Sequence, residues 1–297
     1  MSEHPPSVVH RRQLNATDAG GVDILDAVRC PGEDGGGTLR IFTRSGVAPC
    51  AFDTAAGPGR AAIRDLREVS GAVMVTVDGP ETRLGLAAGG SVNVSPSEAE
   101  WHLLAGRNCL FGFRLEESPE TVADWLRYHA VNHGATGALI VNRAPEDAAA
   151  RPHRAFADRL AALLGSLPGL VIVILECRVP LGKPGLGPEN HPLLAPDAPG
   201  KDRMEVPDPD PWRSPLGEGL LFEIAKWRFL ARARAVLCLD VTDILADRHG
   251  RPNAFDLCRA ASGGVVPVAY THPTLPTIFR GVVAVVGGTI QTKQESN

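Results

Sequence analysis

From about residue 107 onward, short apolar runs alternate with stretches in which apolar residues recur at helical spacing. Four apolar runs of strand length predict buried strands: CLFGFRL at 109–115, GALIVN at 137–142, LVIVILE at 170–176 and AVLCLD at 235–240. The stretches between them predict helices near 118–134, 152–166 and 218–234. Strands that alternate with helices indicate parallel pairing with helical crossovers, so we expect an α/β domain built on a mostly parallel sheet with flanking helices.

The helix expected at 118–134 has signals at both of its ends. Ser118 can accept hydrogen bonds from the free N–H groups of the first turn, and Pro119 suits the first helical position. Glu120 complements the positive end of the helix dipole, and Gly134 supplies a C-terminal stop. The apolar face of this helix carries Val122, Trp125, Leu126, His129, Ala130 and His133.

The rest of the chain divides by composition. We expect residues 1–36 to be a disordered leader that ends in the turn signal PGEDGGG, and residues 37–105 to be a small β-rich module of short strands. Residues 106–268 form the α/β domain, in which the proline- and glycine-rich segment 178–216 is typical of a lid, a binding segment or a disordered excursion.

Composition and charge exclude several classes of protein. The chain has 297 residues, of which 44% are hydrophobic and 22% charged, as is usual for a globular protein. A net charge of −4 provides no positive field for nucleic acid, and we find no apolar stretch of membrane-spanning length. The six scattered cysteines form no Cys-x-x-Cys pair, and the N-terminus has no apolar signal region. We therefore expect a cytoplasmic protein with reduced thiols, no transmembrane segment and no nucleic-acid partner.

Polar side chains follow the predicted strands at the edge where an α/β sheet binds its ligands, namely Glu116, Asn142, Glu176 and Asp240. Asp243 follows Asp240 by three positions. Carboxylates at this place can ligate Mg²⁺ or Mn²⁺, which then neutralises a diphosphate. Alternatively, Asp240 caps the following turn and Asp243 is solvated, since Asp is common where strands end.

Three other motifs do not support a site. HAVNH at 129–133 spaces two histidines by one helical turn, but Ala130 stands where a zinc protease needs Glu, so we interpret the histidines as packing residues. GKPGLG at 182–187 does not join a strand to a helix, as a phosphate-binding loop must. The chain contains no G-x-S-x-G, which excludes the nucleophile elbow of the α/β-hydrolases.

Two segments carry a resemblance to a known family. FRLEESPETVADWLRYHAVNHGATGALIVN at 113–142 and AKWRFLARARAVLCLDVTDIL at 225–245 resemble the inverting family 2 glycosyltransferases. The nearest branch has a Lys/Arg-Asn-Glu strand end, a Glu-Trp helix with Tyr-His, and a later Asp-x-Asp-Glu-Phe segment. The resemblance covers about residues 107–260. It implies a GT-A fold, a UDP- or GDP-linked sugar donor, an Mn²⁺ or Mg²⁺ cofactor, and transfer with inversion to a hydroxyl of a glycan or other acceptor.

Carried over by position, the resemblance implies nucleotide-binding roles for Arg114, Glu116, Asn142 and Asp240. Arg114-Leu115-Glu116 stands near the family's Lys/Arg-Asn-Glu, with its middle Asn lost. Asn142 stands where the family has an Asp that contacts the base or the diphosphate region. An amide at this position can hydrogen-bond but brings no charge.

The same comparison implies a metal site at Asp240, Thr242 and Asp243. Asp240 matches the first Asp of Asp-x-Asp, Thr242 replaces the second, and Asp243 takes the place of the Glu. The family's general base lies further downstream, and we assign no residue to it. Thr242 favours an alternative, a catalytically inactive glycosyltransferase-like protein that binds a nucleotide sugar or a partner. A more distant alternative is an unrelated nucleotide-binding α/β protein.

The segment 269–297 differs in composition from the rest, being rich in Thr and carrying Gln, Lys and Gln close to its end. YTHPTLPT at 270–277 resembles a translated sequencing-adapter read-through. We therefore expect native sequence to stop near residue 268 and the natural protein to be longer at its C-terminus.

Overall fold

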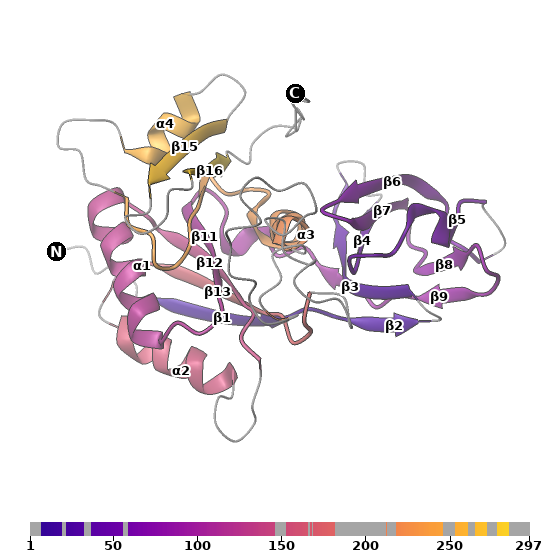
Figure 1. Cartoon of the computed structure of the whole chain (residues 1–297), viewed down its shortest axis with the longest axis horizontal. Coiled ribbons are helices and arrows are strands. Elements are labelled where there is room, and N and C mark those ends of the chain that lie inside the picture. The colour runs from indigo at the N-terminus through magenta and orange to yellow at the C-terminus, as the bar shows by residue number, and fades with distance from the viewer. Residues whose placement is uncertain are drawn as a thin grey trace, which may run out of the picture.

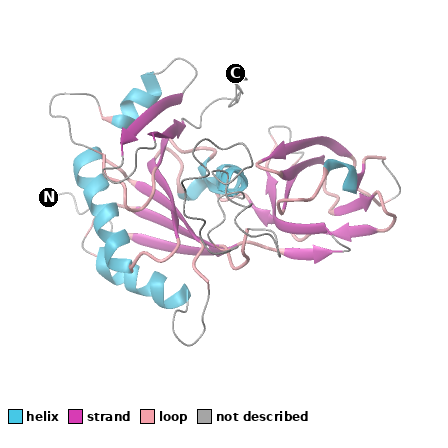
Figure 2. Cartoon of the chain, viewed as in Figure 1, coloured by secondary structure: helices cyan, strands magenta, loops and turns pink. Residues whose placement is uncertain are grey.

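The computed structural model describes residues 7–19, 22–32, 37–55, 59–145, 153–165, 167, 169–181, 212, 218–245, 253–260, 265–271 and 278–284. An α/β part and a β-rich part lie side by side along the long axis of the molecule (Figure 1). Among the helices of the described residues, α1, α2 and α4 lie with the α/β part, and α3 lies between the two parts (Figures 1 and 2). The segment 182–211, including GKPGLG, is outside the described residues.

The α/β part contains a seven-stranded sheet in the order β1-β13-β12-β11-β14-β16-β15. Five neighbouring strands are parallel: β1 (Val8–Gln13), β13 (Val171–Glu176), β12 (Gly137–Asn142), β11 (Asn108–Arg114) and β14 (Ala235–Cys238). Two antiparallel strands, β16 (Ile278–Ala284) and β15 (Val265–Thr271), complete the sheet. The prediction of an α/β protein with a mostly parallel sheet is confirmed, and all four predicted strands occur at their expected places.

Helices cover both faces of this sheet. On one face α1 (Pro119–His133), α2 (His153–Leu164) and α4 (Ala254–Ala260) pack against apolar strand residues such as Ile140 and Ile174. The end signals of α1 work as predicted: Ser118 Oγ accepts a hydrogen bond from the Thr121 N–H at 3.1 Å, and Gly134 ends the helix with a φ of 69°. The other face is covered by α3 (Glu218–Ala225), which continues into a π-helical turn, η7 (Lys226–Leu230).

The β-rich part consists of two sheets whose strands pair antiparallel, except that β10 pairs in parallel with β3. The larger has the order β10-β3-β4-β7-β6, with β2 beside β3. Its strands are β2 (Thr17–Ala19), β3 (Val22–Cys30), β4 (Thr38–Thr43), β6 (Ile63–Val69), β7 (Ala72–Asp78) and β10 (Ser97–Glu98). The smaller contains β5 (Phe52–Asp53), β8 (Arg83–Leu86) and β9 (Ser91–Asn93), and two 3₁₀ turns, η1 (Pro49–Ala51) and η2 (Trp101–Leu103), complete the part.

The prediction that residues 1–36 form a disordered leader is wrong for residues 7–19 and 22–32, which contain β1, β2 and β3. β1 pairs in parallel with β13 from Val8↔Val171 to Gln13↔Glu176. Its sequence VVHRRQ has no strand alternation because β1 is an edge strand and its central side chains are all half-buried. The apolar sequence of β3 is interrupted by the buried Asp26, a residue type that strands usually avoid.

A single hydrophobic core joins the two parts. Leu220, Ile224 and Phe229 of α3 and η7 belong to one cluster of buried residues that also includes Leu139 and Val173 of the parallel sheet and Val28, Phe42 and Met74 of the larger β-sheet. Buried apolar area of this kind is the main favourable contribution to folding. The core therefore holds α3 and η7 in a fixed position relative to both sheets.

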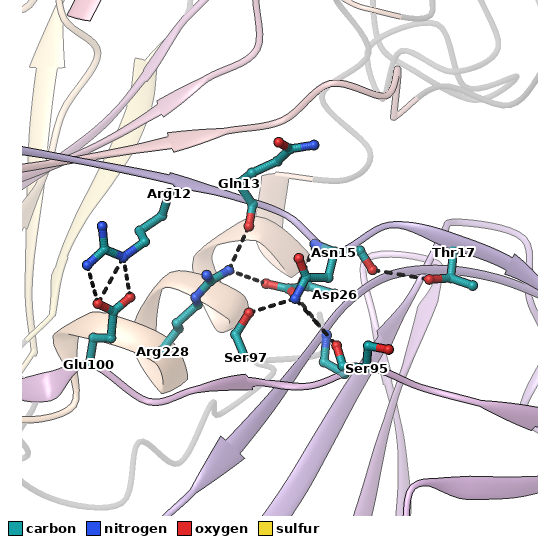
Figure 3. A network of polar contacts seen from close by, with 10 residues as sticks. Arg12, Gln13, Asn15, Thr17, Asp26, Ser95, Ser97, Glu100 and Arg228 are labelled. Atoms are coloured by element: carbon teal, nitrogen blue, oxygen red, sulfur yellow. Dashed lines mark hydrogen bonds and ion pairs between the residues drawn. The ribbon is translucent and has the colours of Figure 1, made fainter. Parts of the chain in front are cut away.

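Polar contacts reinforce this junction (Figure 3). Arg228 Nη1 donates hydrogen bonds to Asp26 Oδ2 and to the main-chain carbonyl of Gln13, each at 3.0 Å. Asp26 is fully buried, and this burial raises the pKa of its carboxyl although the charge of Arg228 opposes the shift. Beside it, Arg12 Nε donates to both carboxylate oxygens of Glu100, at 2.9 and 2.6 Å. β1, β3 and η7 therefore meet at an interface that these polar contacts stabilise.

Within the described part of the chain, no helix combines the length and the apolar character that crossing a membrane requires. Of the segment 269–297, the described residues are 269–271 and 278–284, which belong to β15 and β16.

Candidate functional site

The order of the strands locates a candidate binding position. The chain adds β12 and then β13 on one side of β11, and afterwards crosses over to form β14 on the other side of β11. Adjacent crossovers that leave in opposite directions open a crevice beyond the carboxyl ends of the two central strands. The strand order therefore places the expected crevice between the loop at 115–118, which follows β11, and the turn at 239–245, which follows β14.

The turn after β14 is closely attached to β11. Leu239 N–H donates a hydrogen bond to Phe111 O at 3.0 Å. The next residue of β11 is Gly112, where an added Cβ would lie 2.7 Å from Leu239 O. Glycine is therefore required here by the close approach of the two main chains.

Two hydrogen bonds between Asp240 and Asp243 close this turn. Asp243 N–H donates to Asp240 O at 2.9 Å, and Asp243 Oδ2 accepts from the Asp240 N–H at 3.3 Å. Of the two interpretations that the sequence left open, capping of the turn is present, but Asp243 supplies the cap. Asp240 and Thr242 are both exposed.

Helix α1 binds this turn through the polar groups of its aromatic and histidine side chains. Trp125 Nε1 donates to Asp243 O at 3.0 Å, and the Tyr128 hydroxyl donates to Leu245 O at 2.6 Å. His133 Nε2 lies 3.1 Å from the same Leu245 carbonyl. His129 is fully buried among these rings, with its Nδ1 2.8 Å from Trp125 O. The aromatic and histidine side chains of α1 therefore pack together and position the turn.

Acidic side chains gather around the crevice and influence each other. The pKa of the Asp240 carboxyl is raised, first because surrounding protein atoms partly desolvate it and then by the charges of Asp243 and Glu117, although the residue as a whole is exposed. The pKa of Glu218 is also raised, by burial first and then by the charge of Asp240, while Arg143 opposes this shift. The carboxylates of this edge therefore destabilise each other's charged forms, and a positive charge beside them would reduce this repulsion. Among the residues that the structure describes, however, no three His, Cys, Asp or Glu side chains come together as ligands for one metal ion.

The predicted nucleotide-binding residues have different environments. Glu116 is exposed, and its N–H donates to Glu117 Oε2 at 3.1 Å. Arg114 is half-buried, and its guanidinium lies 4.1 Å from the ring centroid of Phe156. Asn142 is fully buried. Glu116 and Asp240 therefore present side chains to solvent at the crevice, whereas Asn142 belongs to the framework beneath it.

Asn142 has a partner at each end of its amide. Its Oδ1 accepts a hydrogen bond from Arg114 Nη1 at 2.9 Å, and its Nδ2 donates to Glu176 Oε2 at 2.8 Å. A carboxylate at position 142 could serve the first contact but would repel Glu176 in the second. This pair of contacts accounts for Asn in the position where the resemblance leads one to expect Asp.

Two polar residues of this edge were not predicted as site residues. Arg143 follows Asn142 and is buried, with Nη1 2.6 Å from Glu218 Oε1 and Nη2 donating to Trp212 O at 2.7 Å. The position of Arg143 directly after a strand was a signal that could have been used. Glu218 begins α3, distant in sequence from any predicted strand end, and only the fold brings it to this edge.

Comparisons of this chain with family models, with curated proteins and with solved structures find no match.

Proposed function

We propose that this chain binds a nucleotide sugar at the crevice between β11 and β14 and transfers the sugar to a hydroxyl acceptor, as a GT-A-type glycosyltransferase. One observation carries the proposal: Trp125 and Tyr128 of α1 hydrogen-bond to the turn that contains Asp240 and Asp243. These are the two segments with the family resemblance, and they meet where the sheet topology favours a ligand. Residues 114–118 form the opposite wall.

In the proposed reaction, the oxygen of the acceptor hydroxyl attacks the anomeric carbon and its proton passes to a general base. The nucleoside diphosphate leaves with the electrons of the broken bond, and the configuration at that carbon inverts. A divalent cation, Mn²⁺ or Mg²⁺, would supply charge neutralisation for the departing diphosphate. Mg²⁺ commonly binds through one or two carboxylates together with substrate phosphates. Asp240, exposed and destabilised by nearby charges, is the carboxylate best suited to hold the cation, with Thr242 and Asp243 beside it. Glu116, also exposed at the crevice, can accept hydrogen bonds from the nucleotide.

A second candidate function is nucleotide-sugar or partner binding without turnover. It is favoured by Asp243, whose carboxylate accepts a hydrogen bond from the Asp240 N–H. Thr242 supplies a neutral hydroxyl where a second carboxylate would strengthen a metal site. The more distant alternative, an unrelated nucleotide-binding α/β protein, stays open because a fold does not determine a function.

Thermal unfolding with UDP or GDP, each with and without Mn²⁺, separates these functions. Stabilisation that depends on the metal supports the transferase, and equal stabilisation without metal supports the inactive binding protein. The Asp240→Asn variant should lose the metal-dependent part, whereas Asp158→Asn, on the exposed surface of α2, should keep it. An absence of any nucleotide effect on the wild-type protein would contradict both functions.

A further inference from the structure

Four polar side chains form a continuous chain of contacts across the carboxyl ends of three neighbouring strands. His153 Nδ1, at the start of α2, lies 2.6 Å from Glu176 Oε2 at the end of β13. Glu176 Oε2 also accepts from Asn142 Nδ2, and Asn142 Oδ1 accepts from Arg114 Nη1. Since β13, β12 and β11 are adjacent in the sheet, the chain runs toward the crevice. Three of its four members, His153, Glu176 and Asn142, are buried.

The position of each proton in this chain follows from its partners. His153 Nε2 lies 2.7 Å from Ala144 O, which can only accept, so this nitrogen carries a proton. Burial alone would raise the pKa of Glu176, but His153, the Asn142 amide and Arg11 outweigh it and lower this pKa. Glu176 is therefore an ionised acceptor, and its Oε2 lies 2.6 Å from His153 Nδ1.

The ionised Glu176 determines the orientation of the Asn142 amide. A carboxylate can only accept hydrogen bonds, so the NH₂ group of Asn142 faces Glu176 and its carbonyl oxygen faces Arg114. The guanidinium of Arg114 is thus held in place from one side by this oxygen. From the other side it is supported by the ring of Phe156 in α2.

Arg114 connects these contacts to the loop at 115–118, which forms one wall of the expected crevice. Its Nε donates to the main-chain carbonyl of Glu117 at 2.8 Å. Glu117 Oε2 in turn accepts from the N–H groups of Leu115 and Glu116, at 2.8 and 3.1 Å. The loop therefore closes on itself, and its attachment to the sheet depends on Arg114. The carboxylate of Glu117 is also one of the charges that act on Asp240 across the crevice.

We propose that His153, Glu176 and Asn142 are positioning residues that, through Arg114, hold the loop at 115–118 in place as one wall of the candidate site. The effect on the loop follows from the side-chain contacts alone, whereas the consequence for nucleotide binding rests on the proposed function. His153, Glu176 and Asn142 are buried, so they would act on a ligand through the loop and not by contact with it.

The test reverses the polarity of one contact and then restores it. Asn142→Asp places a carboxylate against Glu176 at the 2.8 Å contact and breaks the chain. In the double variant Asn142→Asp/Glu176→Gln, the new amide at 176 donates to the new carboxylate at 142, which still accepts from Arg114. Hydrogen exchange of the amides of Leu115 and Glu116 should become faster in the single variant and return toward the wild-type rate in the double variant.

The amides of β7 in the β-rich part serve as an internal reference, because global unfolding would accelerate both sets. Wild-type exchange of Leu115 and Glu116 in Asn142→Asp, or no recovery in the double variant, would overturn the proposal. If Asn142→Asp does not fold, Arg114→Lys keeps the charge but cannot make both contacts of the guanidinium, and should accelerate the same amides. Arg159→Lys, on the exposed face of α2, should not.

Nucleotide binding gives a second, separable readout. If the wild-type protein binds UDP or GDP, Asn142→Asp should weaken binding by about 10-fold to 100-fold, as when partners that orient ligand-binding groups are lost. The double variant should recover. Equal nucleotide affinity in all three proteins would overturn the link to the site. A wild-type protein that binds neither nucleotide would contradict the proposed function, while the exchange rates still decide whether the chain of contacts holds the loop.

Discussion

The indole N–H of Trp125 donates a hydrogen bond to the main-chain carbonyl of Asp243 at 3.0 Å, across 118 residues of sequence. Tyr128 and His133, on the same face of α1, reach the carbonyl of Leu245. These contacts use main-chain acceptors and leave the side chains of Asp240 and Thr242 exposed, whereas one carboxylate oxygen of Asp243 accepts a hydrogen bond from the Asp240 N–H. The helix therefore sets the position of the turn that carries the candidate ligand residues.

Trp125→Phe removes the indole N–H and keeps most of the aromatic packing. We expect it to lower the free energy of unfolding by about 0.5–1.5 kcal/mol, the usual net value of one hydrogen bond, and to weaken Mn²⁺-dependent nucleotide binding. Urea denaturation and nucleotide titration measure the two effects. Trp101→Phe is a matched control, because Trp101 Nε1 donates to Trp227 O at 2.7 Å away from the crevice. Equal nucleotide affinities of the two variants would show that the turn does not depend on α1.

Thr242→Asp adds a carboxylate beside Asp240 and should strengthen Mn²⁺ binding, since two carboxylates hold a divalent cation better than one carboxylate and a hydroxyl. The affinity can be measured by Mn²⁺ titration followed by electron paramagnetic resonance. Thr54→Asp is the control, because it adds a carboxylate next to Asp53 in the β-rich part and so reports non-specific attraction. If both variants gain Mn²⁺ affinity equally, the turn is not a metal site.

Asp26→Ala leaves the guanidinium of Arg228 buried without its carboxylate partner. Breaking a buried ion pair from one side costs about 3–5 kcal/mol, so we expect a loss of that size in the free energy of unfolding. The control is Asp78→Ala, which breaks the Arg64–Asp78 pair, whose side chains are 52% and 54% exposed. Exposed pairs contribute about 0–1 kcal/mol, and this variant should unfold at nearly the wild-type urea concentration. Similar losses in the two variants would mean that the junction adds little stability.

Glu176 should make the stability of the protein depend on pH in the acid range. Because its pKa in the folded protein lies below the ordinary value, its ionised form stabilises the fold. This stabilisation is complete above about pH 4.3, the ordinary pKa of a glutamate, and is lost as the pH falls through the lowered folded value. The difference in unfolding free energy between wild type and Glu176→Gln should therefore shrink with falling pH. A difference for Glu176→Gln that grows as the pH falls would contradict the ionised carboxylate.

The sequence by itself determined the local structure of the α/β part. The four apolar runs became β11, β12, β13 and β14, and Ser118 and Gly134 marked the ends of α1. Such features can be predicted because they depend on neighbours within one or two turns of the chain: caps bind nearby N–H groups, and periodicity places one face toward a core. The polar residues after the strands, Asp240 among them, were predictable for the same reason.

Only the tertiary structure decided which of these residues act together. β1 was missed because its partner, β13, is about 160 residues away and an edge strand of half-buried residues carries no alternation. Asn142 was expected at the ligand, yet it is buried between Arg114 and Glu176, two residues that no local pattern connects with it. Arg143 and Glu218 meet for the same reason. Contacts of this kind arise when distant elements bury a shared core and the polar groups carried with them must find partners there, because leaving them unpaired would cost more than the packing gains.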